Sequence, residues 1–207
     1  MNGQIVEKVY ERSSFSHCYD IVFGSISQGG RPMAIDALQI APGDTILEIG
    51  SGSALMAPHY PPYCRVSGVD ISDTMLRKGR KRLTQLGIDN FALLQMDATR
   101  LAFSDGQFDK VMAAYFINVV CNPLPSIKEM KRVCRKGGNI VFINHFMSNK
   151  PVVAGFEKAI NPLTRWLGFC TNVPYEGLIR DSGLILDAVI PVQPNGLFWK
   201  IVRCINP

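Results

Sequence analysis

The sequence predicts an α/β fold, with a mostly parallel β-sheet and helices on both faces. Three observations carry this prediction. Short apolar segments of strand length alternate with amphipathic segments of helix length along the 207 residues, a pattern typical of parallel sheets. The first strand-like segment runs directly into Gly50 and Gly52, and the second ends in Asp70. No internal repeat and no Gly/Ser-rich linker interrupts the alternation.

The strand-like segments divide into a parallel set and a closing pair. The first five are separated by helix-like or loop segments, so we expect them to be parallel. The last two are joined by the turn residues Pro194, Asn195 and Gly196, which predict a closing pair. The segments cover residues 45–49, 65–70, 91–95, 110–115, 139–144, 184–190 and 197–204.

Four segments have the periodicity of amphipathic helices. Ser72 provides the N-cap of one of them, and a second spans about residues 126–136. Two more cover residues 5–19 and 152–169, where apolar stripes are flanked by basic side chains. These two helices either pack on the domain or contact lipid, and the sequence leaves both alternatives open.

Composition narrows the class of protein. Apolar residues make up 47% and charged residues 19%, which excludes a disordered chain. The net charge of +5 suits an anionic membrane surface, and we expect no nucleic-acid partner. No apolar run approaches the ~20 residues of a membrane span, and Glu7 and Lys8 stand where a signal peptide needs its apolar stretch. The six cysteines form no CxxC pair and the three histidines no H-x-x-x-H pattern, so we expect reduced thiols, a cytoplasmic location and no metal site.

A ligand site is predicted where the first strand ends. Glycine at positions 50 and 52 lets the backbone turn tightly and approach a ligand closely. Asp70, at the end of the second strand, can accept both hydroxyls of a ribose. A dinucleotide fingerprint needs a third glycine where Leu55 stands, so the pyrophosphate of NAD would find a poorer site here.

Acidic residues at three successive strand ends favour a cationic nucleoside ligand. Glu48 lies inside the first strand end, where a negative charge repels phosphates but suits a ligand with positive charges. S-adenosylmethionine is such a ligand, because it carries an ammonium and a sulfonium. Asp97, after the third strand, can accept from the adenine amino group. With Asp70, these acids would share the carboxyl edge, where open α/β sheets bind ligands.

The motifs as a whole resemble the class I S-adenosylmethionine-dependent methyltransferases. The resemblance runs from about Tyr19 to the C-terminus, with one departure at Ala54, where many members carry glycine. The matching segments are residues 47–53 for the first motif, 68–72 for the second, 96–98 for the adenine motif, and 108–111 and 135–141 before the fourth and fifth strands.

This resemblance implies a Rossmann-like, seven-stranded sheet with an antiparallel closing strand. It also implies that residues 29–207 form the methyltransferase domain, with a helical insert at about 150–182. Residues 1–28 would then be amphipathic helices that cap the active site, and whether they also contact the membrane stays open. The expected cofactor-binding residues are Glu48, Gly50, Gly52, Asp70, Ile71, Asp97, Ala98 and Tyr115.

A closer resemblance, over nearly the whole chain, is to the soluble bacterial phosphatidylethanolamine N-methyltransferases. It rests on residues 19–24, 55–60, 144–146 and 196–203. Quinone C-methyltransferases share the core motifs but are less similar at 19–24 and 144–146. The resemblance implies stepwise N-methylation of a phospholipid toward phosphatidylcholine, at the inner face of the membrane.

Candidate catalytic residues follow from the chemistry of an amine acceptor. The amine is protonated at neutral pH and must lose that proton. His145, just past the fifth strand, is the best candidate to accept the proton or orient the amine. Tyr19 could close the site and hydrogen-bond His145, while its ring attracts the growing cation. Asn118 and Tyr115, at the end of the fourth strand, should lie near the transferring methyl.

Three functional classes stay open at this point. The first is a lipid head-group N-methyltransferase with a phospholipid substrate and an anionic membrane surface as partners. The second is a quinone or other small-molecule methyltransferase. The third is a binding module that keeps the cofactor fold without catalysis, which the intact acids at the strand ends argue against. The sequence leaves the oligomeric state open.

Overall fold

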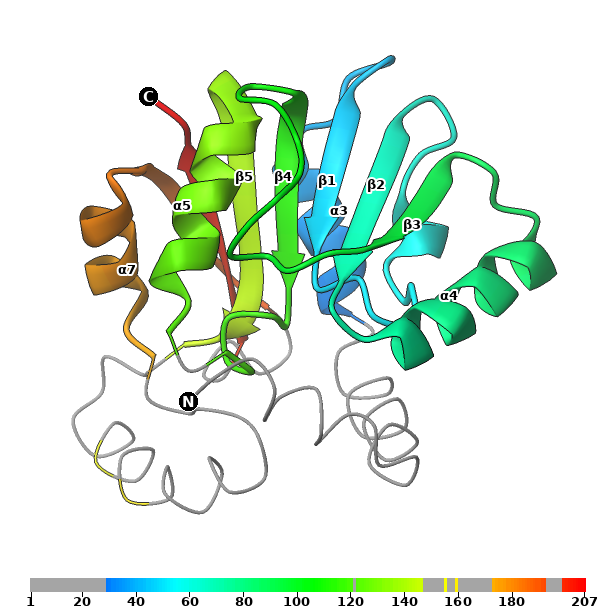
Figure 1. Cartoon of the computed structure of the whole chain (residues 1–207). Helices are drawn as coiled ribbons and strands as arrows, with labels where there is room; N and C mark the ends of the chain where they lie inside the picture. Colours follow the sequence, from blue (N-terminus) through cyan, green and yellow to red (C-terminus); the bar gives the residue numbers. More distant parts are fainter. Residues whose placement is uncertain (1–28, 121, 147–154, 156–158, 160–172, 193–198) are drawn as a thin grey trace.

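The computed structural model describes residues 29–120, 122–146, 155, 159, 173–192 and 199–207. Within these residues the chain forms one seven-stranded sheet with helices packed around it (Figure 1). In chain order the elements are α3 (Gly30–Leu38), β1 (Thr45–Ile49), the 3-10 helix η1 (Ala57–His59), β2 (Arg65–Asp70), α4 (Asp73–Leu86), β3 (Phe91–Gln95), β4 (Phe108–Ala114), α5 (Leu124–Val133), β5 (Cys134–His145), α7 (Tyr175–Ser182), β6 (Ile185–Pro191) and β7 (Trp199–Ile205).

The strand order is β3-β2-β1-β4-β5-β7-β6. The first five strands pair in parallel, and β7 runs antiparallel to both β5 and β6. The predicted mostly parallel, seven-stranded sheet with an antiparallel closing strand is therefore confirmed. The order reverses between β1 and β4, and open α/β sheets bind ligands beside such a reversal, at the carboxyl ends of the strands.

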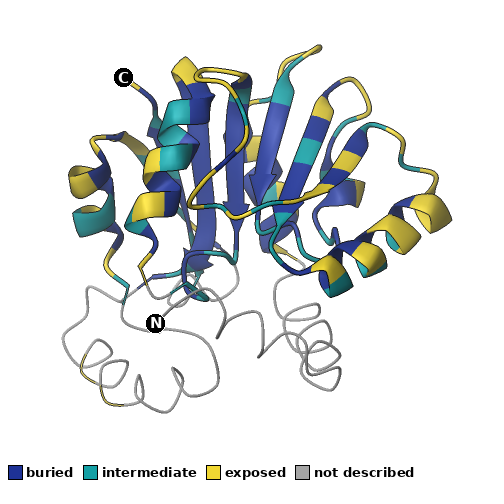
Figure 2. Ribbon diagram, viewed as in Figure 1, coloured by how far each residue is buried: buried dark blue, intermediate teal, exposed yellow. Residues whose placement is uncertain are grey.

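Apolar side chains fill the space on both faces of the sheet. On one face, α3 and α4 pack with side chains such as Ile46 and Met112. On the other face, α5 and α7 pack with Val111 and Phe142. The central strands β1 and β4 and residues 138–144 of β5 are buried, while the edge strands β3 and β6 and the outer helix surfaces are largely exposed (Figure 2). Burial on both faces explains why the central strands read as continuous apolar runs.

The helix expected over residues 126–136 ends earlier than predicted. Helix α5 stops at Val133, and Cys134 adopts an extended backbone and pairs with Phe108 as the start of β5. The basic side chains of Arg135 and Lys136 continue the helical charge pattern but belong to the strand. Arg135 is held there by an ion pair to Asp109, at 2.8 Å.

The end of strand β4 and the presence of helix α3 also differ from expectation. Strand β4 ends at Ala114, because Tyr115 takes a left-handed backbone (φ 57°) and donates its N–H to the Ile143 carbonyl at 2.7 Å. Helix α3 was not expected. Its residues carry no clear amphipathic pattern, and it is defined by packing against β5 and β7.

Several predictions fall outside the described residues. These are the helices expected over 5–19 and 152–169, the N-terminal segment 1–28, and Tyr19. The expected insert at 150–182 is described mainly at its end, as α7. Among the helices that the structure describes, none combines the length and the apolar character needed to cross a membrane.

Candidate active site

The turn after β1 is built on left-handed backbone. Gly50 (φ 70°), Gly52 (φ 50°) and Ala54 (φ 57°) all adopt it. A Cβ on Gly50 would lie 2.7 Å from Cδ2 of Phe116, so only glycine fits there. Ala54 departs from the glycine of the related motifs, and its methyl group is fully buried, at a backbone cost of about 1 kcal/mol.

The N–H groups of this turn are bonded to β2. Gly50 and Ser51 both donate to the Val69 carbonyl, at 2.8 and 3.0 Å, and Gly52 donates to Oδ2 of Asp70 at 2.9 Å. A phosphate cradle requires N–H groups aimed at the ligand. The turn therefore offers close approach of the backbone to a ligand but little positive potential.

Asp70 is fixed in position by the backbone on either side of it. Its Oδ2 accepts from Gly52 and its Oδ1 accepts from the N–H of Ser72, at 2.9 Å. Burial raises the pKa of Asp70, and these N–H groups partly offset that effect. The carboxylate at the end of β2 is thus oriented before any ligand arrives.

Glu48 is a buried acid inside β1, with 1% of its surface exposed. Its Oε2 accepts from the hydroxyl of Tyr60 at 2.7 Å. Burial raises the pKa of Glu48 to about 8, against the lowering effects of Tyr60 and of the charge on Arg31. A carboxyl group in this setting gains strongly from a cationic ligand, because a positive charge would restore the favourable ionised form.

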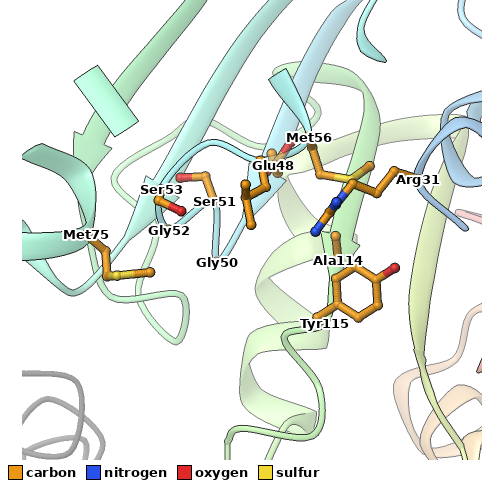
Figure 3. A pocket seen from close by; sticks show the side chains of 11 residues that line it. Arg31, Glu48, Gly50, Ser51, Gly52, Ser53, Met56, Met75, Ala114 and Tyr115 are labelled. Carbon is orange, nitrogen blue, oxygen red and sulfur yellow. The ribbon is translucent and has the colours of Figure 1, made fainter. Parts of the chain in front are cut away.

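An open hollow lies beside Glu48 and the turn (Figure 3). Figure 3 shows the side chain of Arg31 reaching in from α3 toward the ring of Tyr115. The lining residues are Arg31, Glu48, Gly50, Ser51, Gly52, Ser53, Leu55, Met56, Met75, Ala114 and Tyr115.

Aromatic side chains gather where β4, β5 and β7 meet. The rings of Tyr115 and Trp199 meet edge to face with centroids 5.1 Å apart, and those of His145 and Trp199 are 6.1 Å apart. Asn118 donates from Nδ2 to the His145 carbonyl at 2.8 Å. The structure thus places the rings of Tyr115 and His145 against Trp199, which the sequence did not single out, and it joins Asn118 to the backbone of His145.

The predicted cofactor residues occupy two places. Glu48, Gly50, Gly52 and Tyr115 line the hollow, and Asp70 holds its turn. The others, Ile71, Asp97 and Ala98, lie at the ends of β2 and β3, outside that lining. Asp97 uses Oδ1 to accept from the N–H and the hydroxyl of Thr99, both at 2.8 Å, so at least one of its oxygens has a local capping role.

Three residues of the site were missed from the sequence. Tyr60 and Trp199 fall within segments that carried the family resemblance, which was the available signal. Arg31 lies in the unpredicted helix α3, and a single arginine there has no pattern that marks it.

These residues fit S-adenosylmethionine by their chemistry. A buried carboxyl suits an ammonium, an oriented carboxylate suits ribose hydroxyls, and a turn without a phosphate cradle suits a nucleoside that has no phosphate. Among the residues that the structure describes, no cluster of side chains has the composition of a metal site.

Comparison with known proteins agrees with this geometry. Residues 47–142 match the family model described as a methyltransferase domain. The chain is 36% identical over 199 residues to the phosphatidylethanolamine N-methyltransferase of Cereibacter sphaeroides, covering 96% of each chain. The chain belongs to the S-adenosylmethionine-dependent methyltransferases.

More distant relatives of this methyltransferase act on a different class of acceptor. The demethylmenaquinone methyltransferase of Listeria monocytogenes is 26% identical over 168 residues, covering 78% of this chain and 70% of that protein. Among solved structures, an S-adenosylmethionine-dependent methyltransferase from Aquifex aeolicus superposes with a TM-score of 0.68 at 15% identity, with full coverage of both chains. The geranyl diphosphate C-methyltransferase of Streptomyces coelicolor gives a TM-score of 0.72 at 15% identity, covering 86% of this chain and 78% of that one. These structures share the fold.

Proposed function

We propose that this methyltransferase methylates the amine of phosphatidylethanolamine and of its methylated intermediates, toward phosphatidylcholine, at the membrane surface. The observation that carries the proposal is the 36% identity to a phosphatidylethanolamine N-methyltransferase over 96% of both chains. The similarity to quinone enzymes is lower and covers less of the chain. Cytoplasmic location and peripheral attachment to the inner face of the membrane are part of the same proposal.

The cofactor is assigned to the hollow and its rim. Glu48 would bind the ammonium, Gly50 and Gly52 would let the backbone approach, and Asp70 would hold the ribose. Ile71, Asp97 and Ala98, beside the ends of β2 and β3, would receive the adenine. When bound, S-adenosylmethionine supplies an electrophilic methyl group on a sulfonium.

The acceptor is assigned to the aromatic side of the hollow. His145 would take the proton of the lipid ammonium, so that the amine lone pair can attack in line. The hydrogen bond from Asn118 to the His145 carbonyl orients the end of β5, which makes Asn118 a positioning residue. The rings of Tyr115 and Trp199 provide a face suited to an amine that becomes a permanent cation. Tyr19, outside the described residues, would close the site.

The second candidate is methylation of a quinone or another small molecule. The matching demethylmenaquinone methyltransferases favour it. The reduced (hydroquinone) form of a quinone offers a ring carbon as the nucleophile, and loss of the ring proton leaves no positive charge in the product. The two candidates therefore differ in product and in their need for an aromatic cation site.

The deciding experiment is lipid mass spectrometry of a bacterial host that makes phosphatidylethanolamine but no phosphatidylcholine and that expresses this chain. Mono-, di- or trimethylated phosphatidylethanolamine is the expected result. Unchanged phospholipids together with a newly methylated quinone would transfer the proposal to the second candidate.

If His145 and Tyr19 act on the acceptor, their substitution should lower the rate of methyl transfer without lowering the affinity for the cofactor. The variants His145→Ala and Tyr19→Phe should slow methyl transfer to phosphatidylethanolamine by about 10²–10⁴-fold, the usual range for acid–base groups, while S-adenosylhomocysteine affinity stays near wild type. Calorimetry and a radiometric methyl-transfer assay measure the two quantities. Wild-type turnover in both variants would show that these residues do not act on the acceptor.

A further inference from the structure

The connection between β3 and β4 (residues 96–107) starts at the place proposed for the adenine. Asp97 and Ala98 stand at its beginning, and the chain then crosses to α5 before it enters β4 (Figure 1). At this near end the N–H of Met96 donates to the Asp70 carbonyl at 3.0 Å. A connection of this kind carries backbone groups that need partners, so the contacts at its far end decide how firmly it is held.

Arg132 of α5 holds the far end of the connection. Its guanidinium donates to the Leu101 carbonyl at 2.9 Å and to the Phe103 carbonyl at 2.8 Å. It also donates to Oδ1 of Asp105 at 2.7 Å. The planar fork of donors on an arginine can bond several acceptors at once, which the ammonium of a lysine cannot do in the same geometry. One side chain therefore joins three residues of the connection to α5.

Glu129, one turn earlier on α5, completes this contact. Its two oxygens accept from Nε and Nη2 of Arg132, at 2.8 and 2.7 Å. Its Oε2 also accepts from the N–H of Leu101 at 2.8 Å. The hydrogen bonds from Arg132 lower the pKa of the Glu129 carboxyl, so both partners are ionised at neutral pH. The ion pair thus binds both backbone groups of Leu101, shortly after Ala98.

This ion pair differs from the other charged contacts on the helix surfaces. The side chains of Arg132 and Glu129 are 31% and 20% exposed, whereas those of Arg77 and Asp73 on α4 are 68% and 51% exposed. Exposed pairs contribute little, but a network of shared, partly buried hydrogen bonds fixes geometry more firmly. Its use is therefore to be found in the segment that it holds.

We infer that Arg132 and Glu129 are positioning residues for recognition of the adenine. They keep the start of the connection in register with β2, so that Asp97 stays beside the base. Neither side chain lines the hollow, so both act through the backbone of the connection. Asp97 uses Oδ1 for the N–H and hydroxyl of Thr99, which leaves Oδ2 for the amino group of the adenine. The inference rests on the proposed place of the adenine and not on the identity of the methyl acceptor.

Two thioether ligands that differ only in the base test this inference without catalysis. S-adenosylhomocysteine carries the adenine amino group, and S-inosylhomocysteine carries a carbonyl oxygen in its place. Calorimetry with the full-length chain gives the affinity for each ligand, and their ratio measures recognition of the amino group. A residue that only supported the fold would change both affinities and leave this ratio unchanged.

The variants separate the ion pair from the adenine contact itself. Arg132→Gln and Glu129→Ala break the pair, and Arg132→Lys keeps its charge without the fork of donors. Asp97→Ala removes the proposed acceptor of the amino group. The matched control is Arg135→Gln, because Arg135 forms its ion pair with Asp109 at the start of β4.

The expected result is a loss of preference between the two bases. Arg132→Gln and Glu129→Ala should weaken S-adenosylhomocysteine by about 10-fold, the size of a hydrogen bond to a charged group, and leave S-inosylhomocysteine within about twofold of wild type. Asp97→Ala should lose the same preference. Arg132→Lys should change the ratio in the same direction, and it decides the question if Arg132→Gln does not fold. Arg135→Gln should keep the wild-type ratio.

Three outcomes would overturn the inference. A wild-type ratio in the Arg132 and Glu129 variants, with the preference lost in Asp97→Ala, would show that the adenine place is right and that the ion pair does not position it. Equal weakening of both ligands would show that the pair only supports the fold. A wild-type ratio in Asp97→Ala would remove the adenine from Asp97 and the inference with it. Because no acceptor is present, none of these results bears on the lipid assignment.

Discussion

At the scale of single residues, the protonation state of the Glu48 carboxyl should depend on whether the cofactor is bound. Burial raises its pKa to about 8, so in the ligand-free protein the carboxyl is mostly protonated at pH 7. An ammonium placed beside it favours the ionised form and lowers this pKa. Binding of the cofactor should therefore be coupled to loss of a proton.

This coupling predicts proton release when the cofactor binds near neutral pH. Affinity for S-adenosylhomocysteine should rise as pH increases from about 6 to about 8, because above the pKa of the free protein no proton has to be displaced. Calorimetry in buffers of different ionisation enthalpy measures the number of protons. The Glu48→Gln variant should show almost none, and an equal release from wild type and variant would place the proton on another group.

Asp70 supports a second residue-scale prediction. Asp70→Ala removes the acceptor of the ribose hydroxyls and leaves the Gly52 N–H without its partner, so cofactor affinity should fall by roughly 1.5–3 kcal/mol. Calorimetry with S-adenosylhomocysteine measures the change.

The matched control is Asp73→Ala, which removes an exposed acid at the start of α4 that pairs with Arg77 and Arg80. Its affinity should stay near wild type. Wild-type affinity in Asp70→Ala would remove Asp70 from the site.

Apart from Tyr19, the site residues that the sequence predicted share one property: they lie within a few positions of a strand end. Glu48 and Asp70 follow from this, because the carboxyl ends of parallel strands meet at one edge. Arg31, Tyr60 and Trp199 come from a helix wall, a loop and an antiparallel strand. Their contacts with the site depend on tertiary packing, which local sequence patterns do not predict.

At the scale of secondary-structure elements, the approach of α4 to the turn after β1 depends on a glycine. A Cβ on Gly79 would lie 2.7 Å from Cδ1 of Leu93 and 3.1 Å from the Gly52 carbonyl. The helix can thus pack against the backbone that borders the hollow. In α7, Gly177 has only the Arg180 guanidinium near such a Cβ, at 3.9 Å.

These two helical glycines predict opposite results for the same substitution. Gly177→Ala should stabilise the fold by up to about 1 kcal/mol through helix propensity. Gly79→Ala should destabilise it by about 1–3 kcal/mol through overpacking and also weaken cofactor binding, because the Gly52 carbonyl must move.

Denaturant unfolding and calorimetry measure the two effects. If Gly79→Ala were as stable as wild type and bound the cofactor normally, the contact between α4 and the turn would have no role in the site.

Element boundaries were predicted less well than the elements themselves. Apolar content and turn residues located all seven strands. The end of α5 was misplaced because Arg135 and Lys136 continue its charge periodicity although Cys134 already pairs with β4. Helix α3 was missed because its residues pack by shape against the sheet, and Gly30 and Ala34 add little periodic signal.

At the scale of the whole molecule, the candidate site lies along one edge of the sheet, where the parallel strands have their carboxyl ends. The carboxyl ends of β1 and β4 border the hollow, the end of β2 carries Asp70, and the end of β5 carries His145. Segments 1–28 and 147–172, outside the described residues except for 155 and 159, connect to this edge of the domain at Gly29, Phe146 and Val173. The two amphipathic stretches predicted from the sequence fall inside those segments, and the described residues that flank them lie at the carboxyl edge of the sheet.

This arrangement predicts salt-sensitive binding to anionic membranes. The net charge is +5, and each lysine or arginine near an anionic surface contributes roughly 1 kcal/mol. We expect apolar residues of the two stretches, Val9, Phe156 and Trp166 among them, to enter the interface. Vesicle flotation should show binding that increases with the fraction of anionic lipid and decreases at high salt, where screening is stronger.

The apolar part of this prediction has its own variant and control. Substitution of Phe156 and Trp166 by alanine should reduce flotation at every salt concentration, because interfacial burial does not depend on charge. Tyr63→Ala removes an aromatic side chain that is 52% exposed just before β2, at the opposite edge of the sheet, and should bind as wild type does. Absence of flotation at low salt with vesicles rich in anionic lipid would contradict membrane docking, and a soluble acceptor would then be favoured over a phospholipid.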